Sequence, residues 1–513
     1  MTASPVLDLR NITKRFGDTL ANDDVSVSLA KGEVLALLGE NGAGKTTLMS
    51  ILFGHYTPDA GTVHVEGREL PPGKPRAAIR AGVGMVHQHF SLATNLTVLE
   101  NVMTGTESLL RLRSDTRAAR ARLDDVSQRF GLVVDPDARV GDLSVGEQQR
   151  VEILKALYND ARILILDEPT AVLTNIEAEK LFRILRDMAR QGLSLIFISH
   201  KLHEVLAAAD RIVVLRGGKA VAERRAADTS KEELAELMVG RRVERPRREA
   251  ATPGETVLEA RNVSLSGSKG LSHVNFALRA GETLGIIGVS GNGQTALAHL
   301  ASGLVRHEEG DLILFGNPVG KASVRAFIEA GVGRIPEDRN AEGAVGDMTI
   351  WENAILERIW SPTFSRHGLI DRAAARRFAA EIIKAFDVRG GAPDKRIRLL
   401  SGGNMQKLIL GRNLHEQTKL LVAAQPTRGL DEGAIASVHT RILDARKKGA
   451  GVLLISEDLD EVIQLADRIQ AIVKGRLSPP VAADQADARM LGLMMAGDWD
   501  KAGHVAGRGT HEI

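Results

Sequence analysis

A glycine-rich segment near the start of the chain has the residue types of a phosphate-binding loop. Residues 39–47 read GENGAGKTT and follow the apolar run VLALL, so a strand precedes the loop and a helix follows it. Glycines let successive backbone N–H groups point at phosphate oxygens, and the N-terminus of the helix adds its dipole. In such a loop Lys45 reaches the β- and γ-phosphates and the Thr46 hydroxyl binds Mg²⁺. The residues expected to bind nucleotide are Gly39, Glu40, Asn41, Gly42, Ala43, Gly44, Lys45, Thr46 and Thr47.

Two acidic residues at the end of another apolar run supply the remaining chemistry of such a site. The segment RILILDEPT, residues 162–170, contains Asp167 and Glu168. Asp167 can hold Mg²⁺, usually through water, and Glu168 can accept a proton from an attacking water. Alone, the two acids are also consistent with the solvated end of a strand. Together with a phosphate loop they predict nucleotide hydrolysis.

The same frame recurs about halfway along the chain. Residues 288–297 read GVSGNGQTAL, which places Gly288, Gly293 and Thr295 as in a phosphate loop but puts Gln294 where the lysine belongs. Counterparts in the two copies are 249 residues apart near the loops and 257 residues apart further on. A repeat of this length is a domain and not the unit of a solenoid.

The composition is that of an ordinary globular protein. The chain has 513 residues, 43% of them hydrophobic and 26% charged, with a net charge of +2 and no cysteine. The small net charge gives no reason to expect nucleic acid as a partner, and the lack of cysteine excludes disulfides and thiolate metal sites. No run approaches the roughly 18 apolar residues of a membrane span, and the N-terminus lacks the pattern of a secretory signal. We therefore expect an intracellular soluble chain that contacts membranes only through partners.

The chemistry must be positioned by an α/β core in each half. Apolar runs of strand length alternate with charged helical stretches, which predicts layered α/β domains. A stretch rich in helix signals, residues 91–150, lies between core strands and is expected to form a separate lobe. Arginines give way to Ala, Thr, Pro and Gly around the middle of the chain, which is typical of a linker. The expected organisation is a first domain at 1–240, a linker at 241–255, a second domain at 256–497 and a tail at 498–513.

The motifs GENGAGKTT, LSVGEQQR, LILDEPT and FISH, in this order, resemble those of ABC ATPase nucleotide-binding domains. The resemblance covers nearly the whole chain, twice, and implies two RecA-like P-loop cores, each with an inserted helical lobe. It also implies further roles. Gln88 would bridge Mg²⁺, the attacking water and the transporter subunit, and His200 would contact the γ-phosphate. Phe16 would stack on adenine, although a lone aromatic is also consistent with a core residue.

The resemblance implies that ATP lies between two such domains facing head to tail, with the phosphate loop from one and the signature segment from the other. The second half has lost the chemistry of five positions, so its own site is predicted to be catalytically silent. Gln294, Glu337, Ala424, Gln425 and Glu457 stand where the first half has Lys45, Gln88, Asp167, Glu168 and His200.

The signature segments show the opposite asymmetry. The second half keeps LSGGN, with Ser401, Gly402 and Gly403, whereas the first half has Ser144 and Gly146 around a valine. We therefore expect one competent composite site, in which the loop and acids of the first half meet the signature of the second half. Asp431 of the second half should serve that site, and Thr174 of the first half the silent one.

Fused pairs with a degenerate second half resemble the ATPase subunits of bacterial importers for simple sugars and nucleosides. The segments GMVHQHFSLATNLTVLENV, GNGQ and IPEDR favour the nucleoside branch of basic-membrane-protein-type systems over the monosaccharide (ribose or galactose) branch. A tandem ATPase of the ribosome or of DNA repair and a non-catalytic scaffold fit these motifs less well. The resemblance implies ATP and Mg²⁺ as cofactors, with permease subunits and an extracytoplasmic solute-binding protein as partners. The chain is then cytoplasmic and peripheral on the inner face of the cell membrane.

Overall fold

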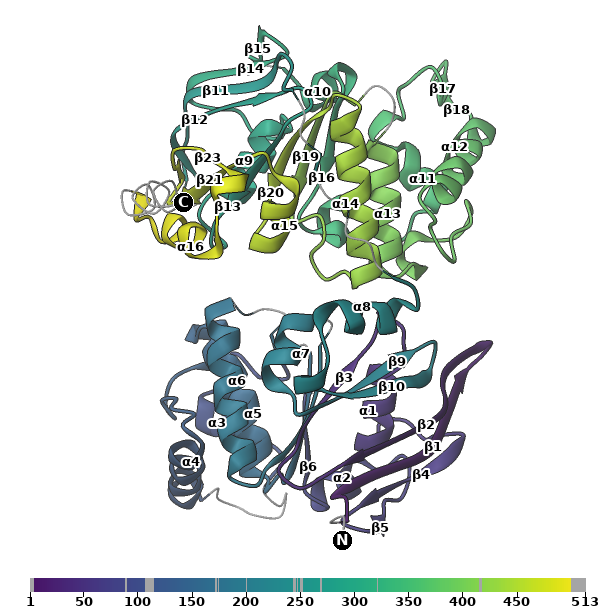
Figure 1. Cartoon of the computed structure of the whole chain (residues 1–513), viewed down its shortest axis with the longest axis vertical. Helices are drawn as coiled ribbons and strands as arrows, with labels where there is room; N and C mark the ends of the chain where they lie inside the picture. The colour runs from purple at the N-terminus through teal and green to yellow at the C-terminus, as the bar shows by residue number, and fades with distance from the viewer. Residues whose placement is uncertain are drawn as a thin grey trace. The chain divides into compact units, whose positions relative to one another are not determined.

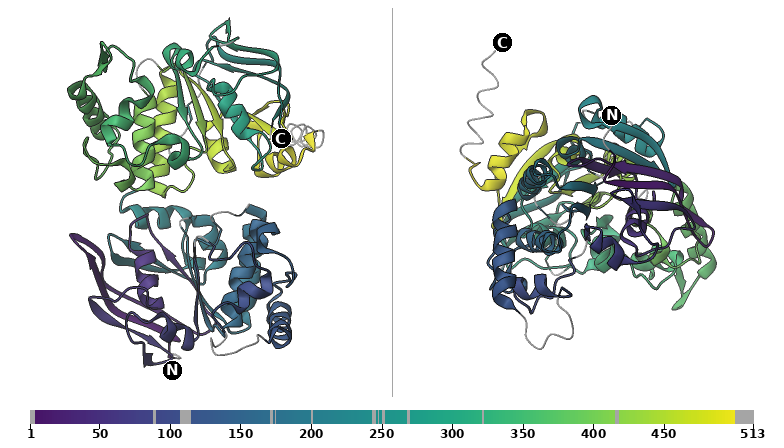
Figure 2. Two further views of the ribbon diagram at one scale, coloured as in Figure 1. Left: turned by 180° about the vertical axis from the view of Figure 1, so that it is seen from behind. Right: turned by 90° about the horizontal axis from the view of Figure 1, so that it is seen from below.

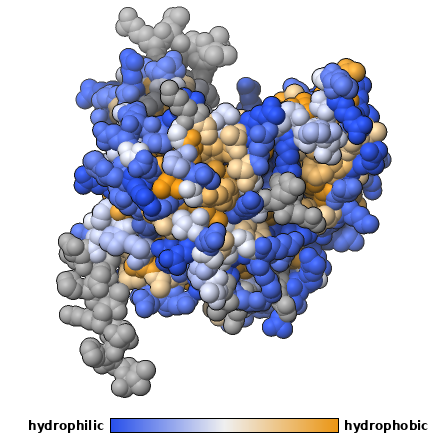
Figure 3. Space-filling view, turned by 90° about the horizontal axis from the view of Figure 1, so that it is seen from above, coloured by the Kyte–Doolittle hydropathy of each residue, from blue (hydrophilic) through white to orange (hydrophobic). Residues whose placement is uncertain are grey.

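The computed structural model divides the chain into two compact units, Met1–Val243 and Glu244–Ile513. It describes residues 4–87, 90–106, 115–170, 173, 175–199, 201–242, 246, 248–249, 252–267, 270–320, 322–414 and 418–499. No helix among these residues has both the length and the apolar character that crossing a bilayer requires. The face seen in Figure 3 is mainly hydrophilic, with apolar residues gathered in patches. The sequence-based bounds of the linker and the tail stay predictions.

The core of the first unit is a six-stranded sheet in the order β10-β9-β3-β8-β7-β6. Its strands are β3 (Val34–Leu38), β6 (Val83–Val86), β7 (Ile163–Asp167), β8 (Ser194–Ile198), β9 (Arg211–Arg216) and β10 (Lys219–Arg225). All neighbours are parallel except β10, which pairs antiparallel with β9. The segments that follow β3 and β7 therefore leave the same edge of the sheet, where ligands bind in open α/β folds.

An antiparallel sheet and a set of helices complete the first unit (Figure 1). The antiparallel sheet has the order β2-β1-β4-β5, from β1 (Leu7–Phe16), β2 (Thr19–Leu29), β4 (Ala60–Val65) and β5 (Arg68–Glu69). The helices are α1 (Lys45–Phe53), α2 (Pro75–Arg80), α3 (Val98–Met103), α4 (Thr116–Phe130), α5 (Val145–Tyr158), α6 (Asn175–Arg190), α7 (Leu202–Ala208) and α8 (Lys231–Val239), with 3₁₀ turns η1 (Val140–Asp142) and η2 (Ala226–Asp228). Leu48 and Leu52 of α1 share one apolar cluster with Leu9 of β1 and Leu35 of β3, so this helix joins the two sheets.

Helices α3, α4 and α5 form the lobe that the sequence predicts. They pack against one another, and in Figures 1 and 2 they lie on the side of the central sheet away from the antiparallel sheet. Two of them begin with a capping box, Thr97 with Glu100 and Ser144 with Glu147, in which each partner satisfies a backbone N–H at the start of the helix.

The second unit repeats this architecture. Its central sheet has the order β16-β19-β20-β13-β21-β22, with β23 also on β21, and its antiparallel sheet the order β12-β11-β14-β15. The strands are β11 (Thr256–Leu265), β12 (Leu271–Arg279), β13 (Thr283–Ile287), β14 (Glu309–Leu314), β15 (Asn317–Pro318), β16 (Val332–Ile335), β19 (Leu420–Ala424), β20 (Gly451–Ile455), β21 (Arg468–Val473), β22 (Arg476–Leu477) and β23 (Val481–Ala482). Strands β13, β19 and β20 take the places of β3, β7 and β8.

The helices of the second unit also correspond to those of the first, with an extra hairpin of β17 (Ser365–Arg366) and β18 (Leu369–Ile370) in its lobe. They are α9 (Gln294–Ala301), α10 (Val324–Ala330), α11 (Ile350–Ile355), α12 (Arg372–Ala385), α13 (Gly402–Asn413), α14 (Glu432–Lys447), α15 (Leu459–Leu465) and α16 (Ala488–Ala496). Short turns are η3 (Arg339–Gly343, a π-helical turn), η4 (Leu356–Arg358), η5 (Ile397–Leu399) and η6 (Ala483–Gln485). The prediction of two α/β domains, each with a helical lobe, is confirmed.

Candidate nucleotide sites

The loop between β3 and α1 is held by glycines that no other residue can replace without strain. Gly44 has φ of 98°, and a Cβ there would come within 2.1 Å of the Ala21 carbonyl oxygen. The Asn22 amide donates to the Gly44 carbonyl over 3.1 Å, which fixes the loop against β2. Asn41 and Gly42 at the tip of the loop are exposed. The loop therefore presents its backbone to solvent at the start of a helix, which is the arrangement that binds phosphate.

Lys45 lies inside this loop. Only 6% of the residue is exposed, and its Nζ donates to the carbonyl oxygens of Gly39 (2.7 Å) and Glu40 (2.9 Å). An ammonium group that is buried among carbonyls exchanges most of its hydration for hydrogen bonds to those carbonyls. A phosphate group brought to the loop would therefore meet a positioned cation.

The two carboxylates lie where β7 leaves the sheet. Asp167 is 5% exposed, and the Thr46 hydroxyl hydrogen-bonds to it. Burial raises the pKa of the Asp167 carboxyl, and so does Glu168, while Lys45, Thr46 and His87 oppose the rise. An ion that relieves this desolvated charge would be bound favourably.

Glu168 has a backbone conformation that few residues other than glycine adopt. Its φ is +46°, in the left-handed region, and its N–H donates to the Ile198 carbonyl of β8 over 3.0 Å. The cost of this conformation is of order 1 kcal/mol or more, and such strain clusters at functional sites. Glu168 directly follows Asp167, and its charge raises the pKa of the Asp167 carboxyl.

A metal ion at this edge would take much of its coordination from outside the protein. Among the described residues, no group of three or more His, Cys, Asp or Glu side chains is arranged to hold a metal. Thr46 and Asp167 are hard oxygen donors that lie together, and Mg²⁺ characteristically completes its shell with phosphate oxygens and water. The residues present fit a magnesium–nucleotide complex better than a free ion.

Phe16, at the end of β1, has an exposed ring. The residue is 43% exposed, so it does not belong to the core, and its ring meets Tyr56 edge to face at a centroid distance of 5.3 Å. The Lys14 ammonium lies 5.4 Å from the ring centroid. Three other residues that the sequence singles out, Gln88, Thr174 and His200, lie outside the described residues.

The corresponding loop of the second unit keeps its shape and replaces the lysine with an internal hydrogen-bond bridge. Gly293 has φ of 111°, and Gln294 is 8% exposed. The Gln294 Nε2 donates to the Val289 carbonyl over 2.8 Å, while its Oε1 accepts from the Asn292 N–H over 2.9 Å. Both polar groups of the amide are thus used within the loop, and one of them occupies a backbone N–H.

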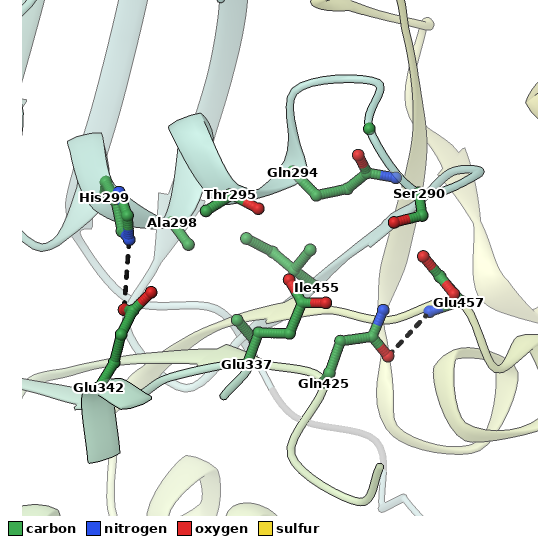
Figure 4. A pocket seen from close by; sticks show the side chains of 12 residues that line it. Ser290, Gln294, Thr295, Ala298, His299, Glu337, Glu342, Gln425, Ile455 and Glu457 are labelled. Atoms are coloured by element: carbon green, nitrogen blue, oxygen red, sulfur yellow. Dashed lines mark hydrogen bonds and ion pairs between the residues drawn. The ribbon is translucent and has the colours of Figure 1, made fainter. Parts of the chain in front are cut away.

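A pocket lies beside this loop (Figure 4). It is lined by Ser290, Gly291, Gln294, Thr295, Ala298, His299, Glu337, Glu342, Ala424, Gln425, Ile455 and Glu457. Gln425 has φ of +47° and its N–H donates to the Ile455 carbonyl over 2.7 Å, so the turn of Glu168 is retained. The backbone of the catalytic turn survives, while Ala424 and Gln425 remove both carboxylates.

Basic side chains of the same unit partly offset the acids of this pocket. Glu337 forms an ion pair of 2.5 Å with Arg428, and Glu342 contacts His299 at 3.3 Å and also Arg334. Desolvation raises the pKa of the Glu457 carboxyl, Arg428 lowers it and Glu337 raises it further. The sequence shows the acids but not the arginine that compensates them, because Arg428 and Glu337 are 91 residues apart.

The two signature serines differ in a way that the sequence comparison overlooks. Ser144 Oγ donates to the Glu147 carboxylate over 2.7 Å. Asn404 takes the place of Glu147 in the second unit, and its amide donates to Ser401 Oγ over 2.9 Å. The Ser401 hydroxyl keeps its proton for another acceptor, whereas the Ser144 hydroxyl is engaged by a carboxylate that would repel phosphate. The S-x-x-E pattern of a capping box was the signal for this difference.

The remaining predicted residues lie around the second signature. Gly402 and Gly403 begin α13, and a Cβ on Gly403 would come within 3.2 Å of Ala434 Cβ. Asp431 caps α14 by accepting the Ala434 N–H over 2.9 Å. Gly146 lies near the start of α5. The structure therefore gathers each half's loop and strand-end residues at one sheet edge, and each signature at the start of a helix.

Known proteins match this chain over nearly its full length. The sequence profile of the family described as ABC transporter matches residues 22–171 and 271–428. A nucleoside import ATP-binding protein of Lactococcus lactis is 43% identical, over 97% of this chain and 99% of its own length. A guanosine import ATP-binding protein of Bacillus subtilis is 42% identical over 97% and 98%. A glucose import ATP-binding protein of Haloferax volcanii is 44% identical over 98% and 97%.

Proposed function

The chain belongs to the ABC transporter family, and we propose that it is the ATP-hydrolysing subunit of an importer for a nucleoside or a simple sugar. The observation that carries this proposal is the set in the first unit: a buried loop lysine, Lys45, with Asp167 and Glu168 at the same sheet edge. Relatives named for nucleoside, guanosine and glucose import match the chain over nearly its full length. Their names support the proposal that ATP hydrolysis by this chain is coupled to import of a solute.

In this proposal the first unit holds the phosphates and prepares the water. Lys45 and the loop N–H groups would bind the β- and γ-phosphates, and Thr46 with Asp167 would hold Mg²⁺. Glu168 accepts the proton of the attacking water, for which its neighbouring carboxylate and partial burial are suitable. We further propose the roles inferred from the family resemblance for Gln88, His200 and Phe16, namely water and metal bridging, γ-phosphate contact and adenine stacking.

We propose that the signature of the second unit completes this site. Ser401 can donate its hydroxyl proton, and the N–H groups of Gly402 and Gly403 begin a helix of 12 residues. Ser144 is less suitable because its hydroxyl already donates to Glu147. We propose that Asp431 of the second unit also serves this competent site.

The second pocket is proposed to be catalytically silent. Its loop offers an amide that is already hydrogen-bonded in place of a cation, and the end of β19 offers no carboxylate. Glu337 and Glu457 add negative charge where phosphate would lie, and Arg428 only partly offsets them. Such a pocket can support the fold of its unit without hydrolysing ATP.

The partners and location follow from the importer proposal. We propose that separate permease subunits and an extracytoplasmic solute-binding protein complete the system, and that the chain lies on the cytoplasmic face of the membrane through those permeases. Relatives named for nucleoside and guanosine import, together with the segments GNGQ and IPEDR, favour a nucleoside. The relative named for glucose import keeps a sugar as the second candidate.

The test is uptake by the assembled system. Cells that carry the chain with its permeases and binding protein should accumulate a labelled nucleoside, and the Glu168→Gln variant should not. The solute-binding protein purified from the same system should bind that nucleoside directly. Binding and uptake of a monosaccharide but no nucleoside would move the assignment to the sugar branch. Uptake unaffected by Glu168→Gln would overturn the coupling to hydrolysis.

A further inference from the structure

Arg339 of the second unit holds an unusual position beside the signature segment. Its side chain reaches the start of α13, where a Cβ placed on Gly402 would lie 2.8 Å from Arg339 Nη2. The same nitrogen would be 3.4 Å from a Cβ on Gly429, in the loop that follows β19. The guanidinium therefore lies against two positions that have no side chain, and a Cβ at Gly402 would leave it too little room.

The first unit has apolar residues at the equivalent sequence positions. Phe90, Val145 and Val172 stand where the second unit has Arg339, Gly402 and Gly429. Three positions that are far apart in the sequence thus differ together between the two copies. Of the two valines, Val172 lies outside the described residues, while a Cβ at the position of Val145 would come within 2.8 Å of Arg339 Nη2 in the second unit.

Arg339 is not placed there by an ion pair. Its Nη1 donates to the Arg428 carbonyl oxygen over 2.7 Å, and no carboxylate of the described residues lies within ion-pair distance of it. Desolvation lowers the pKa of the Arg339 guanidinium, Asp338 opposes that effect, and the charge of Arg428 adds to it. A cation at a helix N-terminus is also disfavoured by the helix dipole. The position is electrostatically unfavourable for an arginine unless an anion is bound beside it.

We propose that Arg339 is a further phosphate-contacting residue of the competent site, donating to the terminal phosphate of the nucleotide that Ser401, Gly402 and Gly403 receive. This inference rests on the proposed composite site. A guanidinium can donate two parallel hydrogen bonds to phosphate oxygens, and arginine is the residue that stabilises charge on a transferring phosphoryl group in many nucleotide hydrolases. Because Phe90 occupies the equivalent position of the first unit, the first signature cannot make this contact.

The test uses the full chain assembled with its permeases, with Arg339→Ala, Arg339→Gln and Arg339→Lys. Loss of one charge-assisted contact should lower ATP turnover by about 10- to 100-fold in Arg339→Ala and Arg339→Gln, with Arg339→Lys retaining part of the activity. Arg398→Ala is the matched control, because this exposed arginine lies three residues before Ser401 and pairs with Asp347 at 3.0 Å. Its turnover should equal that of the wild type. A thermal unfolding curve for each variant identifies loss of fold.

A second readout separates phosphate contact from support of the helix. In the Glu168→Gln background, Arg339→Gln should weaken the binding of ATP but leave the binding of ADP unchanged. Equal weakening of both nucleotides, or turnover of Arg339→Gln within about threefold of the wild type, would overturn the role of Arg339. Ser401→Ala is measured in parallel: if it impairs turnover while Arg339→Gln does not, only the arginine proposal fails. If neither variant impairs turnover, the composite site fails as well.

Discussion

The substitution Gln294→Lys restores the residue that the second loop lacks, and the structure sets its expected effect. Gln294 makes two hydrogen bonds within the loop, to Val289 and from Asn292. A lysine can keep the bond to the Val289 carbonyl and add one to the Gly288 carbonyl, as Lys45 does with the equivalent atoms. The Asn292 N–H loses its partner, at a cost of about 1 kcal/mol. The fold of the loop should therefore survive.

The gain for nucleotide is limited to one charge-assisted contact. Such a contact contributes about 1.5–3 kcal/mol, which corresponds to roughly a 10- to 150-fold lower Kd. The carboxylates of Glu337 and Glu457 lie in the same pocket and compete for the new ammonium group, so the lower end of this range is expected. Replacing Gln294 with alanine is the control, because it removes both amide bonds and supplies no charge.

The assay combines each substitution with Glu168→Gln, so that any ATP turnover must come from the second unit. Equilibrium binding with labelled ATP should show a lower Kd at a second site for Gln294→Lys than for Glu168→Gln alone. Gln294→Ala should show no such decrease in Kd. Turnover should remain at the level of Glu168→Gln alone, because Ala424 and Gln425 supply neither a metal ligand nor a base. Substantial hydrolysis by Gln294→Lys with Glu168→Gln would refute this account of the second pocket.

Three other predictions follow from the same residues. Ser401→Ala should reduce turnover of the assembled complex more than Ser144→Ala, because the Ser144 hydroxyl is already bound to Glu147; equal effects or the reverse order would contradict this. Glu457→Gln should raise the free energy of unfolding at pH values above the raised pKa of Glu457. This gain should vanish at pH values below the usual glutamate pKa of about 4.3, because the protonated carboxyl carries no desolvated charge. A gain that grows as the pH falls would be contrary evidence. The chain should be recovered with membranes only when its permeases are present, and fractionation of a strain without them checks this.

The sequence predicts the fold well because the local sequence patterns agree with the secondary structure that the chain adopts. Apolar runs such as VLALL became strands buried along all five residues, and the glycines before Lys45 became the loop that the motif requires. The repeat, read from matching motifs, appears as two units with equivalent sheet orders. Motif spacing alone places these features since each depends on neighbours within a few residues.

What the sequence does not predict depends on contacts between distant segments. Replacement of Lys45 by Gln294 suggests a missing charge, but only the structure shows that the amide closes the loop on itself. The pairing of Glu337 with Arg428 and the position of Arg339 between two glycines need the folded chain. No sequence motif marks such contacts, because they depend on how distant segments pack and not on the spacing of residues along the chain.

The central claim is that hydrolysis takes place only at the first unit's strand-end acid, and a matched pair of variants tests it most directly. Glu168→Gln and Gln425→Ala change equivalent positions, each in a turn with positive φ. In the complex assembled with permeases, steady-state ATP turnover should fall by about 10²- to 10⁴-fold for Glu168→Gln, as expected for loss of a general base. Gln425→Ala should stay close to the wild type. Retention of more than about a tenth of the turnover by Glu168→Gln, or an equal loss in Gln425→Ala, would contradict the account.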